Sequence, residues 1–170
     1  MIVTRAAEKD IPELVALLNS AYRGEGSKKG WTTEADMVSG EIRTDEANLK
    51  KLMQTPDAIF LKAVNEENKI EGCVFLDIRG NKLYLGMLSV LPALQAKGTG
   101  KELMKAAELH AKKNNCDTIF MRVISIRHEL ISWYERKGYQ KTGATEPFPE
   151  NDPFGTPTTT FHFNIMEKQL

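Results

Sequence analysis

A short turn holds the residues with the clearest potential for chemistry. It spans residues 95–100, reads Q-A-K-G-T-G and is followed by Lys101. The turn joins an apolar run to an amphipathic stretch, so we expect it to lead from a strand into a helix. Free N–H groups and the dipole at a helix start attract phosphate, and glycine lets a ligand approach the backbone closely. These residues predict a phosphate-binding turn; a plain helix start with glycines for tight entry is the alternative.

Two common phosphate loops do not fit this turn. A Walker A loop needs G-x-x-x-x-G-K-[ST], but Gln95 stands in the place of its first glycine and Glu102 follows Lys101. A dinucleotide fingerprint needs a third glycine, and the chain has Leu103 there. The pattern that remains is Q-x-x-G-x-G, after a run that ends at residues 88–92 as L-S-V-L-P.

Hydrophobic periodicity predicts the elements that must position this turn. Helical spacing and end signals indicate helices over residues 10–22, 45–55, 99–113 and 128–137, and the start of a short one at 31–37. Strand patterns cover residues 2–5, 58–64, 70–78, 83–90, 118–124, 139–142 and 161–168. Asp10 and Glu13 have the spacing of a capping box. Short turns between the three central strands predict an antiparallel meander, so the fold class is α/β with a largely antiparallel sheet.

Composition narrows the class of protein. The chain has 170 residues, 23 basic and 23 acidic, which suits one domain over residues 1–170. The balanced charge argues against a nucleic-acid partner, and no apolar run approaches a membrane span. Cys73 and Cys116 are far apart, with no C-x-x-C pair and no histidine at metal-ligand spacing, so we expect two reduced thiols, no metal site and a cytoplasmic protein.

The motifs together resemble those of the Gcn5-related N-acetyltransferase (GNAT) superfamily. Its acetyl-CoA-binding motif is Q/R-x-x-G-x-G/A, preceded by a strand of type L-x-V-x-P, and both patterns occur in register here. A downstream family helix, A-x-x-L-Y-x-x-x-G-F/Y, is similar to residues 131–139, although Leu130 and Arg127 depart from the family's Ala and Asn. The resemblance implies a mixed, mostly antiparallel sheet with helices on both faces. It also implies that two parallel strands splay apart to hold the cofactor.

The same resemblance implies which residues bind acetyl-CoA. Backbone groups of the strand end would pair with pantetheine amides, and N–H groups of the turn would bind the pyrophosphate. The implied cofactor-binding residues are Leu88, Ser89, Val90, Gln95, Ala96, Lys97, Gly98, Thr99, Gly100 and Lys101.

For the chemistry, family precedent implies direct attack of an amine in a ternary complex. The backbone N–H of Leu88 would stabilise the oxyanion, and Tyr134 matches the family's general acid. Packing beside Trp133 is the alternative role for Tyr134. Several members have a glutamate base where this chain has Tyr84, which leaves the base unassigned.

Two loops, at residues 23–36 and 147–157, are the regions that would recognise the acceptor amine. Their acidic and aromatic residues predict a cationic or aromatic amine of a small molecule or peptide. We expect Glu25, Trp31, Glu34 and Tyr84 to contact it, in a monomer or homodimer. The rival interpretation is a non-catalytic acyl-CoA sensor or interaction module, which the missing glutamate favours.

Overall fold

A computed structural model of the chain describes residues 1–23, 27–28, 30, 33–40, 42–95, 97–149 and 152–170. Its helices are η1 (Glu8–Asp10), α1 (Ile11–Tyr22), α2 (Glu46–Met53), η3 (Pro92–Leu94), α3 (Thr99–Lys113) and α4 (His128–Arg136). Its strands are β1 (Ile2–Arg5), β2 (Ala58–Val64), β3 (Ile70–Arg79), β4 (Lys82–Val90), β5 (Thr118–Ile124), β6 (Gln140–Pro147) and β7 (His162–Gln169).

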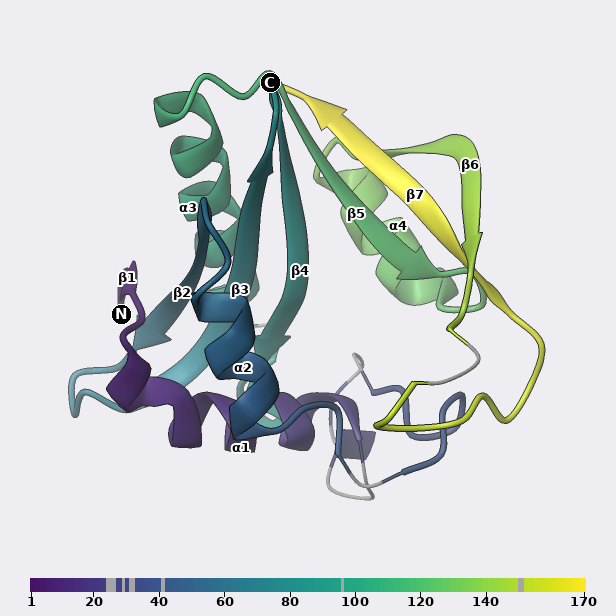
Figure 1. Cartoon of the computed structure of the whole chain (residues 1–170), viewed down its shortest axis with the longest axis horizontal. Helices are drawn as coiled ribbons and strands as arrows, with labels where there is room; N and C mark the ends of the chain where they lie inside the picture. Colours follow the sequence, from purple (N-terminus) through teal and green to yellow (C-terminus); the bar gives the residue numbers. More distant parts are fainter. Residues whose placement is uncertain (24–26, 29, 31–32, 41, 96, 150–151) are drawn as a thin grey trace.

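The strands form one sheet in the order β1-β2-β3-β4-β5-β7-β6. Between the described strands, β4 and β5 make the parallel pair and the other neighbours are antiparallel. The parallel pairing runs from Lys82↔Thr118 to Tyr84↔Phe120, and the two strands then diverge like the arms of a V (Figure 1). The predicted fold class and the predicted splay are both confirmed.

Helices cover both faces of the sheet, each over its own hydrophobic core. On one face, α3 buries the stripe of Leu103, Met104, Ala107 and Ala111 against the central strands, as its periodicity predicted. On the other face, α1 and α2 pack apolar side chains such as Leu14 against β2 and β3. The helices thereby hold β4 from both sides, which fixes the strand end that precedes the turn.

The predicted capping box at the start of α1 is wrong. The Asp10 carboxylate accepts a hydrogen bond from the Ala7 N–H at 2.8 Å and pairs with the Lys62 ammonium at 2.9 Å. Glu13 instead accepts from the Ile70 N–H at 2.8 Å, far along the chain. Lys62 and Ile70 connect both acids to the sheet, and the bond between Asp10 and Ala7 belongs to η1, so neither acid caps α1.

Two further boundaries differ from the sequence prediction. The described part of segment 31–37 forms a turn at residues 35–37 and no helix. β6 extends to Pro147, beyond the predicted end at residue 142, because β7 pairs with it as far as His162. None of the helices in the described residues has the length and apolar character needed to cross a membrane.

Candidate active site

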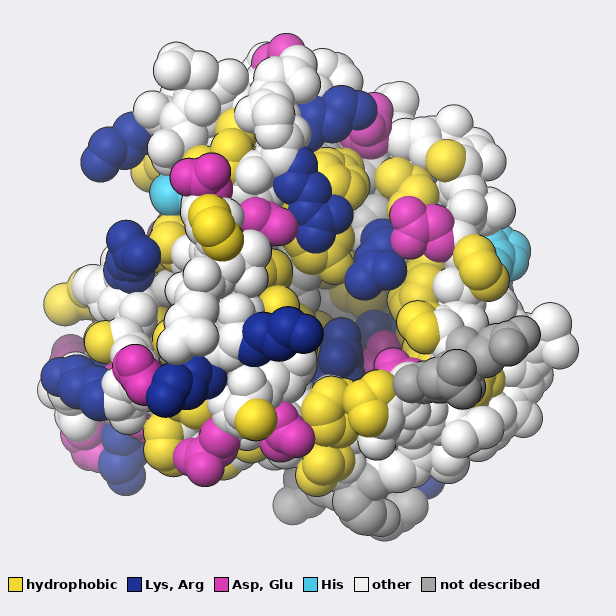
Figure 2. Space-filling view, viewed as in Figure 1, with side chains coloured by type: hydrophobic (Ala, Val, Ile, Leu, Met, Phe, Trp, Pro, Cys, Tyr) yellow, Lys and Arg dark blue, Asp and Glu magenta, His cyan; other side chains and the backbone are white. Residues whose placement is uncertain are grey.

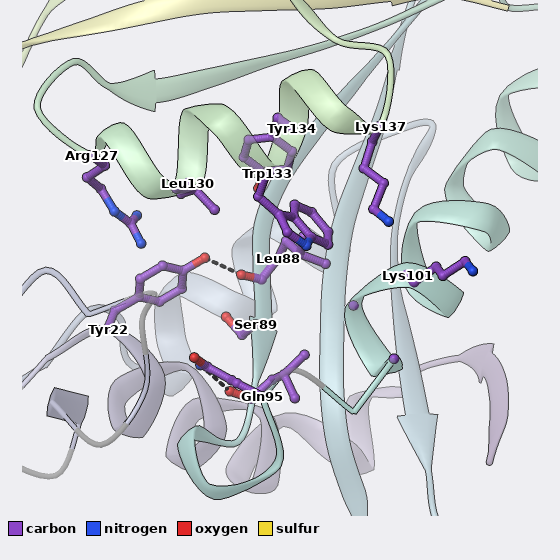
Figure 3. A pocket seen from close by; sticks show the side chains of 13 residues that line it. Tyr22, Leu88, Ser89, Gln95, Lys101, Arg127, Leu130, Trp133, Tyr134 and Lys137 are labelled. Carbon is purple, nitrogen blue, oxygen red and sulfur yellow. Dashed lines mark hydrogen bonds between the residues drawn. The ribbon is translucent and has the colours of Figure 1, made fainter.

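The open edge of β4 is the backbone part of the site. A register shift near Cys73 and a positive φ of 52° at Met87 mark a bulge in this strand. Just beyond it, the Leu88 carbonyl accepts a hydrogen bond from the Tyr22 hydroxyl of α1 (Figure 3). Because the N–H and C=O of one strand residue point to the same edge, the Leu88 N–H also faces the splay.

The predicted phosphate turn forms the next part of the site. Gly98 has a left-handed φ of 92° and is the N-cap of α3, and a Cβ built on it meets nothing within 4 Å. The Gln95 side-chain amide donates to the Val90 carbonyl at 3.0 Å and thereby closes the turn. Gly30 packs so closely on Gln95 that a Cβ there would lie 2.5 Å from its Oε1. The loop after α1 thus supports the turn.

A cleft of about 220 Å³ lies between the β4 edge, the start of α3 and one face of α4. Figure 3 shows Tyr22, Leu130 and Trp133 around the same space, whereas the Lys101 side chain points away from it. The lining residues are Tyr22, Leu88, Ser89, Val90, Gln95, Gly98, Gly100, Lys101, Arg127, Leu130, Trp133, Tyr134 and Lys137.

Most of the residues expected to bind the cofactor line this cleft. Lys97 is exposed and its side chain lies outside the lining, whereas Thr99 is buried against Gly72 of β3. Ala96 lies outside the described residues. The side chains of Lys97 and Thr99 therefore do not form the cleft wall, and only their backbone groups belong to the turn.

The sequence prediction missed a wall of the cleft that α4 provides. Leu130, Trp133 and Lys137 share one face of the helix, and the Trp133 ring lies 3.7 Å from a Cβ built on Gly100. The Lys137 ammonium lies 5.3 Å from the Trp133 ring centroid. Their spacing of three and four residues was the available signal.

Tyr134 is buried at the junction of this cleft with a second cavity, and it lines both. Its ring packs against Trp133 and Tyr139 at centroid distances of 5.3 and 6.0 Å. Burial raises the pKa of its phenol well above the ordinary value, and the neighbouring Tyr22 hydroxyl adds to this effect. Among the described residues no group accepts a hydrogen bond from its hydroxyl, and Tyr134 borders both cavities.

The second cavity, of about 210 Å³, lies on the other side of the Tyr22–Leu88 contact. Tyr84 lines it and packs edge-on or tilted against Phe75 and Phe120, and the Arg79 guanidinium lies 4.5 Å from its ring centroid. Glu34 also lines it, but its carboxylate is buried among three arginines. The sequence analysis expected Glu34 to be available to a cationic substrate, whereas its carboxylate is already paired. Glu25 and Trp31 lie outside the described residues.

The two loops expected to recognise the acceptor contact each other. Residues 37–39 pair with residues 156–158, through Ser39 N–H to Thr156 O and Thr158 N–H to Met37 O, both at 2.8 Å. The Arg23 guanidinium adds a hydrogen bond of 2.7 Å to the Phe154 carbonyl. The described parts of both loops therefore form one structure at the mouth of the second cavity.

The turn, the splay and Tyr134 all lie within one sequence match. Residues 12–139 match the family described as the Acetyltransferase (GNAT) family, which is well over half of the chain. The chain belongs to this GNAT family. It is also 29% identical, over 113 residues, to the uncharacterized protein YdhI of Bacillus subtilis. That match covers 66% of this chain and 62% of YdhI, so it spans less than two thirds of the relative.

Solved structures of GNAT proteins share the fold over the whole chain. The PaiA N-acetyltransferase of Thermoplasma acidophilum, solved in complex with coenzyme A, is 23% identical, with a TM-score of 0.70 and 100% of each chain covered. A ribosomal-protein-alanine N-acetyltransferase of Brucella melitensis is 18% identical, with a TM-score of 0.73 and 100% of each chain covered. At these identities the likeness establishes the fold.

Proposed function

We propose that this GNAT protein is an acetyl-CoA-dependent N-acetyltransferase that acts on a primary amine of a small molecule or peptide. The observation that carries the proposal is the single cleft that joins the glycine turn, the open β4 edge and Tyr134. The open space at Gly98 and the lysine at position 101 suit a pyrophosphate group. The coenzyme A complex of the Thermoplasma protein supports the same choice of cofactor.

The proposed chemistry uses two groups of this chain. The amine attacks the thioester carbonyl directly, and the Leu88 N–H stabilises the negative charge that develops on its oxygen. Tyr134 gives its proton to the departing thiolate sulfur of coenzyme A, which the acetyl transfer releases. No carboxylate stands at Tyr84, so the base that takes the proton of the amine is left open between water and another side chain.

The proposal extends to the organisation of the protein. Residues 1–170 would act as one domain, as a monomer or homodimer, in the cytoplasm. Both described cysteines, Cys73 and Cys116, are free and buried, which supports a reducing compartment.

Cofactor binding tests the proposal first. Coenzyme A and acetyl-CoA should raise the melting temperature with increasing concentration. Gly98→Glu should abolish this shift, because its charge and bulk oppose the phosphates, whereas Gly98→Asn tolerates the left-handed backbone and should keep most of it. Stabilisation by ATP or NAD without coenzyme A would contradict this assignment of the turn.

Turnover tests the catalytic part of the proposal. A panel of amines with acetyl-CoA should release coenzyme A, which a thiol reagent detects with little protein background because both cysteines are buried. Cofactor binding without acetylation of any amine or peptide would instead support the sensor interpretation.

A further inference from the structure

The cleft and the second cavity meet at a shared wall. The second cavity lies where β4 and β5 diverge, with residues 84–88 and 121–124 in its lining, and Figure 2 shows a hollow there, near the middle of the molecule. Five of the described residues line both spaces, namely Tyr22, Leu88, Arg127, Leu130 and Tyr134. In the proposed reaction the thioester reaches this wall from the cleft, and the amine reaches it from the second cavity. The acyl group therefore lies at the wall.

Helix α4 runs along the cleft from the glycine turn to this wall. At the turn, the Trp133 ring lies 3.7 Å from a Cβ built on Gly100, and the Lys137 ammonium lies 5.3 Å from the centroid of that ring. Trp133 and Lys137 line the cleft alone, whereas Leu130 and Tyr134 line both spaces. Because Leu130 precedes Tyr134 by four residues, the two side chains share one face of the helix. The helix thus brings Leu130 to the shared wall, at the end away from the turn.

The shape of a thioester decides which side chain its acyl group meets. The carbonyl carbon is planar, so when its oxygen points to the Leu88 N–H of β4, the sulfur and the acyl carbon point away from that strand, toward α4. The sulfur belongs beside Tyr134, which gives it a proton. The acyl carbon then faces Leu130, the aliphatic side chain of α4 at the wall (Figure 3). Leu130 is 7% exposed and belongs to the same core cluster as Met121 and Val123, so close packing holds it in place.

We infer that the Leu130 side chain limits the transferred group to acetyl, because it fills the space into which a longer acyl chain would extend. This inference rests on the proposed acetyltransferase function and assigns its acyl specificity to one side chain. The two additional methylene groups of butyryl would press on a close-packed leucine, and overpacking of this kind is unfavourable. Alanine at this position would remove three carbon atoms, which is more than the two that distinguish butyryl from acetyl.

Binding of acyl-CoA in the absence of an amine tests the inference directly. Calorimetric titration of the wild-type protein should show that butyryl-CoA binds about 10-fold or more weakly than acetyl-CoA. Leu130→Ala should bind the two thioesters about equally and keep the wild-type affinity for coenzyme A, which has no acyl group. Leu61→Ala is the matched control, since Leu61 is 9% exposed and belongs to the same core cluster but lines neither space. It should keep the wild-type ratio of affinities.

A smaller substitution guards against loss of the fold, because Leu130→Ala leaves a cavity in the core. Leu130→Val removes one carbon atom, so it should bind propionyl-CoA about as well as acetyl-CoA and still discriminate against butyryl-CoA. The melting temperature of each variant checks that it is folded at the temperature of the titration. Equal affinities of the wild-type protein for acetyl-CoA and butyryl-CoA would overturn the inference, and so would the wild-type ratio in a folded variant of Leu130.

Turnover separates this inference from the proposed function. With an amine that the panel identifies as an acceptor, the ratio of kcat/KM for butyryl-CoA to that for acetyl-CoA should rise about 10-fold or more in Leu130→Ala. Discrimination between the two thioesters in binding, without turnover of any amine, would reject the proposed function and retain the acyl limit. Turnover of both thioesters at equal rates by the wild-type protein would reject the limit and retain the transferase function. Failure of coenzyme A to bind would reject both.

Discussion

Tyr134 offers a test at the scale of one functional group. Tyr134→Phe keeps the ring contacts with Trp133 and Tyr139 but removes the proton that the thiolate needs. We expect kcat to fall by about 10²-fold with acetyl-CoA affinity nearly unchanged. Because burial raises the pKa of this phenol, Tyr134 stays protonated and the loss should be similar from pH 6 to pH 9. Steady-state kinetics across that range measures it.

Tyr139 provides the matched control. Its hydroxyl is buried and has no hydrogen-bond partner among the described residues. Tyr139→Phe should therefore leave kcat unchanged and raise the free energy of unfolding by about 1 kcal/mol. Full activity in Tyr134→Phe would assign the proton to solvent and leave Tyr134 with a packing role.

A substitution at Gly100 should change stability and cofactor binding in opposite directions. A Cβ there would make only ordinary contacts with Trp133, at 3.7 Å. Gly100→Ala should raise the free energy of unfolding by about 0.5 kcal/mol, since alanine favours the first turn of a helix. The same methyl group should weaken coenzyme A binding about 10-fold by obstructing the phosphates. Denaturant unfolding and calorimetric titration measure the two effects, and unchanged binding would move the pyrophosphate away from Gly100.

At the scale of elements, the sequence predicts the bounds of a helix or strand correctly where local patterns alone determine them. The bounds of α3 match the prediction because its apolar stripe, N-terminal turn and lysine-rich end agree. The capping box predicted at Asp10 is wrong because Lys62 and the Ala7 N–H bind its carboxylate instead. The wall formed by Trp133 was missed because a ring on a helix face packs equally well in a core or a cleft.

The acceptor side of the site could not be predicted from residue types. Glu34 looked like a free anion because the sequence does not show that Arg23, Arg43 and Arg127 converge on it. These residues are up to 104 positions apart along the chain, so the fold alone brings them together. The place of Tyr134 in the cleft was predictable because a family motif fixes its distance from Gly138, and its role as the acid stays a prediction.

The contact between the two loops that are expected to recognise the acceptor gives a prediction for these segments. A Cβ on Gly155 would meet the Ser39 carbonyl, and would lie 2.6 Å from both Arg23 Nη1 and Val38 Cγ1. Gly155→Ala should lower the free energy of unfolding by about 1–3 kcal/mol and raise the KM of the acceptor, with coenzyme A affinity nearly unchanged. Denaturant unfolding and steady-state kinetics measure these changes.

Gly143 of β6 is the control for this substitution. It has a positive φ of 88° and nothing within 4 Å of an added Cβ. Gly143→Ala should cost about 1 kcal/mol through backbone strain alone and leave the acceptor KM unchanged. If both variants change KM alike, the effect comes from stability and not from the loop contact.

For the whole molecule, buried thiol and phenol groups predict that the free energy of unfolding falls at alkaline pH. Burial raises the pKa of the Cys73 thiol to about 12, and it also raises the pKa of Tyr22 and Tyr134. Their contribution is fully present below the pKa values of the unfolded chain and is lost as pH rises, because the unfolded chain releases these protons first. The free energy of unfolding should therefore fall between about pH 9 and pH 12, as urea titrations at each pH would show.

Cys73→Ala tests the origin of this slope. The variant is less stable at neutral pH because it leaves a cavity, but its stability should fall less steeply between pH 9 and pH 12. A parallel curve for the variant would assign the alkaline loss to other groups.

The pairing of residues 37–39 with residues 156–158 also bears on how this scaffold could be re-engineered. Arg23, which precedes the first segment, also donates a hydrogen bond to the Phe154 carbonyl next to the second segment. The two segments therefore depend on each other for their structure. A graft of one loop from a relative would break the hydrogen bond between Arg23 and Phe154 and would leave backbone groups of the other loop without their partners. If these loops recognise the acceptor, as we expect, acceptor preference should be transplanted only with both loops together.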